Sequence, residues 1–209
     1  MSVAVESQAT YDLDDVPRIV GSSFKLGLIQ AAVVFAFSLV SRFLGGPLET
    51  ILEAALILVG LAATTGLPAL WTRARSGSGI AAAAGIGLGA TIVFLLTDVV
   101  LLQRIGTYTN RWLAIGGGSN WWYHPVWWMA GTYLTWMGAT IIANQTTRTG
   151  TPSIPGMIST VVVFAGVLGV VANVIGFPGA GWNLATFAIA CLPGYALTAL
   201  VSWMRVRHD

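Results

Sequence analysis

Three carboxylates stand inside or at the edge of long apolar segments, where an ionised side chain is costly and usually has a purpose. Glu49 and Glu53 are four residues apart and therefore share one face of a helix. Asp98 is expected about one turn inside the end of another apolar segment, at a similar depth. Glu49 falls in a first helical turn and complements the helix dipole. For Glu53 and Asp98 the sequence leaves two interpretations open, a structural ion-pair network and a site for a proton or cation.

Three arginines are expected on the same side of the protein as these acids. Arg42, Arg104 and Arg111 each lie close to the end of an apolar segment or in the segment that follows it. A guanidinium that reaches a carboxylate removes most of the cost of placing the acid near lipid. We therefore treat these arginines as candidate ion-pair partners of the three acids.

A cluster of aromatic residues forms the second candidate site. Five of the nine tryptophans fall between positions 112 and 128, namely Trp112, Trp121, Trp122, Trp127 and Trp128. We favour an aromatic belt at the membrane interface, combined with a helix start at Pro125. The alternative is that the three glycines at 116–118 let the chain fold back, so that the indoles wall a pocket around His124. Such a pocket would hold a lipid, a quinone-like ring, a cation or a partner helix.

Other catalytic and metal-binding patterns do not occur in the sequence. There is no phosphate-binding glycine loop, no His-Glu-x-x-His pair and no paired-cysteine ligand set. The single cysteine, Cys191, lies in an apolar run and is interpreted as a packing residue. Two histidines are too few for a multi-histidine metal site. The sequence therefore indicates no metal and no cofactor, and it favours a protein that is not an enzyme.

The elements that must position these residues follow from composition. Of the 209 residues, 56% are hydrophobic and only 9% are charged, whereas soluble domains carry about 25% charged residues. The net charge of +2 arises from few titratable groups, so nucleic acid is not an expected partner. The main solvent, and the first expected partner, is membrane lipid.

Six apolar segments are long enough to cross a bilayer as helices, which needs about 20 residues each. They cover approximately residues 22–44, 49–71, 79–102, 125–144, 156–177 and 183–204. These runs lack the alternation of barrel strands, so the fold class is an all-α, polytopic membrane protein with about six transmembrane helices. We expect a polar tail at 1–20 that is not a signal peptide, one six-helix domain at 21–205 with a Gly-rich, aromatic outer loop at 103–124, and a short tail at 206–209.

Orientation is expected from the distribution of Lys and Arg, which are in excess on the cytoplasmic side. With six helices, seven of these residues fall on the side of the termini and three on the other side. Both termini are therefore expected in the cytoplasm, and we expect a multi-pass protein of a prokaryotic plasma membrane.

Small residues spaced four apart predict where membrane helices approach closely. The rows are Ala81, Gly85 and Gly89; Gly131, Thr135 and Ala139; and Ala165, Gly169 and Asn173. Isolated polar residues within the apolar segments are expected to hold helices together by hydrogen bonds. These residues are Gln30, Thr64, Thr65, Asn144 and Asn173.

These features favour an accessory or scaffolding subunit of a larger membrane complex, with other membrane subunits or a homo-oligomer as partners. The arguments are the small mass outside the membrane, the small-residue rows and the aromatic outer face. The alternative is a small proton-linked or cation transporter or channel that uses Glu53, Asp98 and His124. An enzyme acting on lipid or quinone near His124 is less favoured, because one titratable group rarely suffices for acid–base catalysis.

Overall fold

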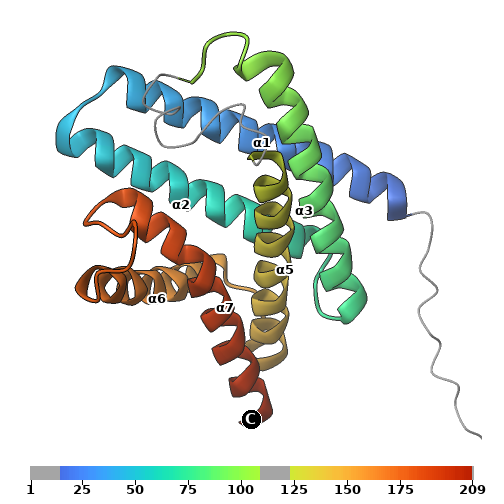
Figure 1. The fold of residues 1–209 in the computed structure, drawn as a ribbon. Helices are drawn as coiled ribbons and strands as arrows, with labels where there is room; N and C mark the ends of the chain where they lie inside the picture. Colours follow the sequence, from blue (N-terminus) through green and yellow to red (C-terminus); the bar gives the residue numbers. More distant parts are fainter. Residues whose placement is uncertain (1–14, 109–122, 209) are drawn as a thin grey trace, which may run out of the picture.

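The computed structural model describes residues 15–108 and 123–208. Within these ranges the chain forms six α-helices and no strand, which confirms the predicted all-helical architecture (Figure 1). The helices are α1 (Asp15–Phe43), α2 (Gly46–Trp71), α3 (Gly77–Thr97), α5 (Tyr123–Thr149), α6 (Ile154–Val174) and α7 (Leu184–His208). A π-helical turn, η1 (Asp98–Leu102), continues α3.

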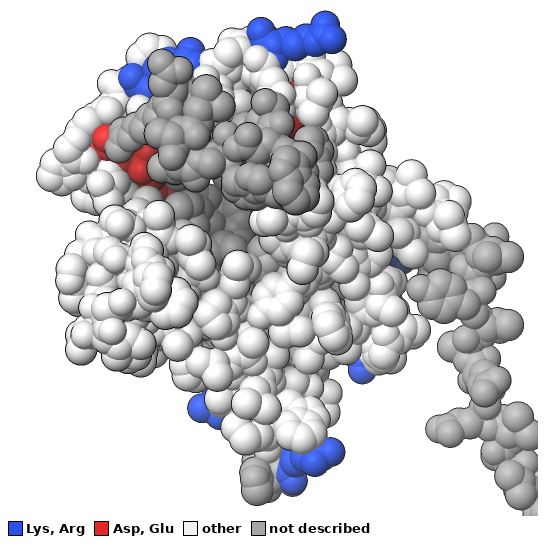
Figure 2. Space-filling model, viewed as in Figure 1, with Lys and Arg blue, Asp and Glu red and all other residues white. Residues whose placement is uncertain are grey.

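The surface of the molecule has the composition of a multi-pass membrane protein. Five helices, α1, α2, α3 with η1, α6 and α7, are long and apolar enough to span a bilayer. Large apolar side chains on these helices remain exposed, for example Leu96 at 61%, Val163 at 64% and Ile189 at 66%. Figure 2 shows that charged side chains gather mostly at two opposite ends, with a broad uncharged surface between them. Lipid, rather than water, is the solvent that this surface fits.

Helix α5 is 27 residues long but more polar than the other five. It packs against α2, α3 and α7, so its middle part faces protein more than lipid. The threonine hydroxyls along α5 donate to carbonyls of the same helix, mostly one turn earlier, which satisfies them without a partner helix. Such bonds occur at Thr132, Thr135, Thr140 and Thr146. A helix surrounded by other helices needs less apolar surface than one surrounded by lipid.

The packing divides into a four-helix group and a hairpin. Helices α1 and α5 each pack against both α2 and α3, so these four form a closed ring. Helices α6 and α7 form an antiparallel hairpin that packs mainly on α5 through α7 (Figure 1). The guanidinium of Arg18 donates to the carbonyl of Trp71 at 2.7 Å, which joins the start of α1 to the end of α2.

The helix boundaries lie within a few residues of most predicted segments. The largest differences are at α1, which begins at Asp15 inside the expected polar tail, and at the end of α5, which continues to Thr149. The connection between α1 and α2 contains only two residues outside the helices, and Gly46 takes a φ of +69° there. A positive φ costs glycine little, which allows the sharp reversal.

The predicted small-residue contact rows on α5 and α3 differ in whether the structure buries them. The row on α5 is confirmed, because Gly131, Thr135 and Ala139 are all buried. On α3 a Cβ added at Gly85 would meet nothing within 4 Å, and Ala81 is exposed, so of that row Gly89 alone lies at a close helix approach. The contact face of α3 is rotated toward Ala83, Gly87 and Ala90 because α3 packs between α1 and α5.

Hydrogen bonds between helices are confirmed for four of the five polar residues. They join Gln30 to Thr64 at 3.2 Å, Thr65 to Tyr195 at 3.2 Å and Asn144 to Ser202 at 2.9 Å. The side chain of Asn173 instead donates to the carbonyls of Gly169 and Gly181, within and just after its own helix.

Candidate site: an apolar cavity within the four-helix ring

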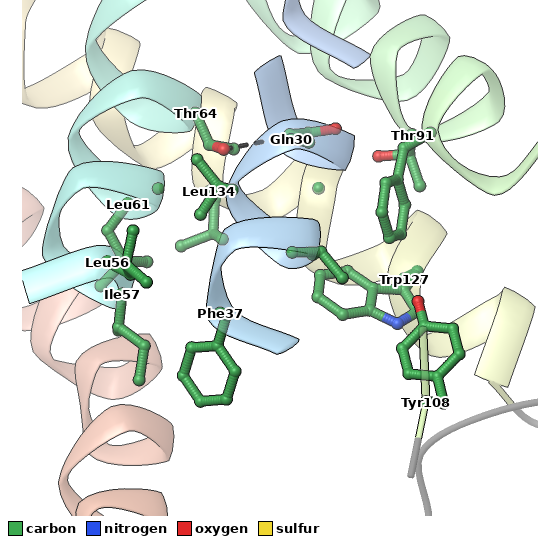
Figure 3. A pocket seen from close by; sticks show the side chains of 15 residues that line it. Gln30, Phe37, Leu56, Ile57, Leu61, Thr64, Thr91, Tyr108, Trp127 and Leu134 are labelled. Atoms are coloured by element: carbon green, nitrogen blue, oxygen red, sulfur yellow. Dashed lines mark hydrogen bonds between the residues drawn. The ribbon is translucent and has the colours of Figure 1, made fainter. Parts of the chain in front are cut away.

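A partly open cavity of about 320 Å³ is lined by the four helices of the ring, α1, α2, α3 and α5. This volume is within the range of small-molecule sites, which begins at about 300 Å³. The lining side chains are predominantly aliphatic or aromatic, and all four helices contribute to them (Figure 3). They include Val33, Val34 and Phe37 from α1, Leu56, Ile57 and Leu61 from α2, Phe94 from α3, and Trp127 and Leu134 from α5.

Two glycines help to create this space. Gly60 on α2 and Gly131 on α5 both line the cavity and contribute no side chain to it. The absent Cβ at Gly131 also leaves room for the side chain of Thr91, which a Cβ there would overlap. Backbone therefore forms part of the cavity wall on two neighbouring helices, α2 and α5.

One end of the cavity is polar. The amide of Gln30 donates to the hydroxyl of Thr64 at 3.2 Å, and both side chains line the cavity. Gln30 is near the midpoint of α1, so this pair lies deep in the apolar part of the molecule. In Figure 3 the oxygen of the Gln30 amide points away from Thr64, on the side of Thr91.

The opposite end is aromatic. Phe37 lies seven residues after Gln30, which is about 10 Å along a helix. The rings of Trp127 and Phe94 are 5.4 Å apart with an interplanar angle of 58°, a tilted arrangement that favours contact. Tyr108 completes this end of the cavity, beside Trp127 (Figure 3). The cavity thus joins an amide and a hydroxyl at one end to flat apolar rings at the other.

Asp98 lies next to this aromatic end. It is completely buried, and its carboxylate accepts hydrogen bonds from Gln103 Nε2 at 2.7 Å and from the hydroxyl of Tyr108. The π-helical turn that begins at Asp98 shifts the register of the helix, so that Gln103 is five residues ahead and still in reach. π-Turns of this kind are frequent at functional sites. The hydrogen-bond partners of Asp98 are thus two neutral donors, whereas one of our two interpretations of this acid was an ion pair with an arginine.

Arg42 also stabilises this part of the chain, but through backbone atoms. Its guanidinium donates to the carbonyl of Gly106 and, at 3.4 Å, to that of Thr107. The end of α1 is thereby fixed to the segment that carries Tyr108. The charge of Arg42 is thus used to satisfy two carbonyl groups.

The other predicted residues are distributed as follows. Glu49 is buried and Glu53 is half-buried, and both interact with other residues, although neither lines the cavity. Arg104 is exposed. Of the aromatic cluster, Trp127 lines the cavity and Trp128 is 46% exposed. The remaining predicted residues lie outside the described side chains: Arg111, Trp112, Trp121, Trp122 and His124.

Metal binding has no structural support in residues 15–108 and 123–208. Within these ranges, no three His, Cys, Asp or Glu side chains cluster closely enough to hold a metal ion. The donors and acceptors at the cavity are instead an amide and hydroxyl groups, which suit a neutral organic ligand.

Sequence reasoning missed most of the cavity. Gln30 and Thr64 were identified as polar residues in apolar helices but were interpreted only as interhelical contacts. That signal was sufficient to propose a site, since polar groups at this depth are functional candidates by default. Phe37, Phe94 and Tyr108 carry no such signal, because their convergence depends on how four helices cross.

Comparisons with known protein families, with curated proteins and with solved structures found no match.

Proposed function

We propose that this protein binds a small, mainly apolar molecule within the membrane, in the partly open cavity lined by α1, α2, α3 and α5. The observation that carries the proposal is the cavity itself, of about 320 Å³, which residues of all four helices line. Membrane helices gain stability by close packing, so a space of this size between four helices reduces that gain. A ligand that fills the space restores the lost contacts.

The lining favours an apolar ligand over a cation. Among the described residues no charged side chain lines the cavity, and the carboxylate of Asp98, which is bonded to the cavity-lining Tyr108, already accepts two hydrogen bonds. A dehydrated cation needs several oxygen ligands or a carboxylate to replace its water. Aliphatic and aromatic walls offer neither, but they do match the surface of a hydrocarbon.

A cavity-filling substitution tests the proposal. Leu56→Trp places a larger ring into the cavity, whereas Leu58→Trp makes the same change two residues later, at a position that does not line the cavity and is 37% exposed. The measurement is mass spectrometry of small molecules that co-purify with each variant from its own membrane. We expect Leu56→Trp to lower the bound amount at least about tenfold and Leu58→Trp to leave it unchanged. Equal occupancy in the two variants contradicts the proposal.

Proton-linked or cation transport is a second candidate, favoured by one observation. Tyr108 lines the cavity and donates to Asp98, so a single hydroxyl connects the cavity to a buried carboxylate. Under this candidate, Asp98→Asn abolishes solute-linked proton flux in proteoliposomes while the protein stays folded. Unchanged flux removes Asp98 from any transport mechanism.

We further propose that both termini lie in the cytoplasm of a prokaryotic cell. The N-terminal end of α1, the connection after α2 and the C-terminal ends of α5 and α7 carry most of the described Lys and Arg. A role as an accessory subunit, with its exposed aromatic residues as an interfacial belt and partner surface, is compatible with ligand binding and stays a prediction. A stoichiometric partner after gentle solubilisation supports it.

A further inference from the structure

The polar end of the cavity has unused hydrogen-bonding capacity. A glutamine amide offers two N–H donors and an oxygen with two acceptor positions. Within the described part of the chain, Gln30 uses one N–H, for the bond to Thr64 Oγ1, and its oxygen makes no hydrogen bond. The hydroxyl of Thr64 accepts that bond, and its own hydrogen has no acceptor among the described residues. One acceptor and at least one donor therefore remain at this end.

Thr91, a third polar residue that lines the cavity, differs from Gln30 and Thr64 because its hydroxyl is already hydrogen-bonded. The hydroxyl of Thr91 donates to the carbonyl of Gly87 at 2.9 Å, one turn earlier on α3. Its hydrogen is therefore used within its own helix, as is common for threonine in membrane helices. Thr91 lines the same cavity and so provides an internal comparison for Gln30 and Thr64.

An incompletely bonded amide near the middle of an apolar protein is unfavourable unless a further partner is present. A water molecule could bond to the unused groups of Gln30 and Thr64 but would leave the apolar walls beside them without contacts, whereas an organic molecule satisfies the same groups and fills the space against the walls. A charged ligand group is also disfavoured, since none of the described residues that line the cavity is charged. A neutral oxygen that both donates and accepts, or that accepts alone, fits the remaining groups.

We propose that the cavity selects a compact, uncharged and mostly hydrocarbon molecule that carries a hydroxyl or carbonyl oxygen, with that oxygen bound between Gln30 and Thr64. This inference rests on the proposed ligand-binding function and specifies the chemical class of the ligand. The hydrocarbon part lies against Phe37, Phe94 and Trp127, of which Phe37 is about 10 Å from the amide along the axis of α1. Flat or cyclic skeletons suit these walls, because aromatic rings pack well face to edge and offset.

A pair of matched probes tests the selection. 1-Naphthol and 1-methylnaphthalene have the same two-ring skeleton and nearly the same size, but only 1-naphthol carries a hydroxyl. Binding is measured by equilibrium dialysis with the full-length protein in phosphatidylcholine nanodiscs, with empty nanodiscs giving the partition background. We expect 1-naphthol to bind about tenfold more tightly, which corresponds to about 1.4 kcal/mol. That is the net value of about one hydrogen bond.

Three isosteric variants assign the preference to residues. Gln30→Leu and Thr64→Val remove the unused polar groups with little change in volume, and each is expected to reduce the preference for 1-naphthol to less than about twofold. Thr97→Val removes a hydroxyl that is likewise used within α3, at a position that does not line the cavity, so this matched control keeps the preference. Far-UV circular dichroism of each variant establishes that it is folded before its binding is compared.

The outcomes separate this inference from the function on which it rests. Equal binding of the two probes to the wild-type protein overturns the selection by oxygen but leaves an apolar binding site. A preference that survives in both Gln30→Leu and Thr64→Val also overturns it, because recognition then takes place elsewhere. Absence of saturable binding for both probes, together with unchanged occupancy in Leu56→Trp, overturns the ligand-binding function itself.

Discussion

Helices α2 and α5 approach each other closely at a glycine, Gly138. A Cβ added at Gly138 would lie 2.7 Å from Cβ of Thr65, about 0.7 Å short of the 3.4 Å at which ordinary van der Waals contact begins. The obstructing atoms belong to Thr65 and its backbone rather than to the end of a flexible side chain. Thr65 is itself fixed, since its hydroxyl also hydrogen-bonds to Tyr195 at 3.2 Å. Gly138→Ala therefore forces the two helices apart.

The expected cost follows from this overlap. Overpacking a well-packed interior by one methyl group costs about 1–3 kcal/mol. Replacing glycine by alanine within a helix also gains up to about 1 kcal/mol from backbone entropy, which offsets part of that cost. Gly85→Ala isolates the gain, because Gly85 is exposed on α3 and a Cβ there meets nothing within 4 Å. The difference in stability between the two variants should equal the overpacking cost of about 1–3 kcal/mol.

The assay is equilibrium unfolding in mixed micelles with increasing sodium dodecyl sulfate, followed by circular dichroism and tryptophan fluorescence. Gly138→Ala should unfold at a lower fraction of the denaturing detergent than the wild-type protein, and Gly85→Ala at the same or a higher fraction. If the two variants unfold together, α2 and α5 do not approach at Gly138. In that case the ring that encloses the cavity would need a different helix arrangement.

Two further predictions concern the buried acid and the orientation. An asparagine at position 98 presents an N–H to one of the two donors that now bond to the carboxylate, Gln103 Nε2 or the Tyr108 hydroxyl. Because that donor loses its acceptor, Asp98→Asn should destabilise the protein by about 1.5–3 kcal/mol in the same unfolding assay. Tyr108→Phe should couple to it in a double-mutant cycle, whereas a stable Asp98→Asn protein that has lost proton flux supports transport instead. For orientation, a membrane-impermeant maleimide should label Thr50→Cys but not Ser78→Cys in intact cells. Thr50 lies in the first turns of α2 and Ser78 at the start of α3, so the length of α2 separates the two positions, and the reverse labelling pattern places the termini outside.

The predictable part of the site was limited to residues whose chemistry is unusual for their surroundings. Asp98, Gln30 and Thr64 stand out because a polar side chain in an apolar helix is costly wherever the helix packs. Their partners could not be derived. Asp98 meets Tyr108, ten residues ahead, only because a π-turn and a chain reversal bring the two together. An arginine pairing was an equally reasonable prediction from sequence.

The sequence by itself determined the fold class, the approximate helix boundaries and the membrane environment. These properties depend on local quantities, since each apolar segment must reach a length set by the bilayer and satisfy its own backbone hydrogen bonds. The tertiary structure alone decided which faces of the helices meet. Ala81 and Gly85 have the same spacing as Gly131 and Thr135, yet only the α5 pair is buried. Lipid is as apolar as a neighbouring helix, so hydrophobicity does not mark the contact face, and packing shape decides both the contacts and the cavity between them.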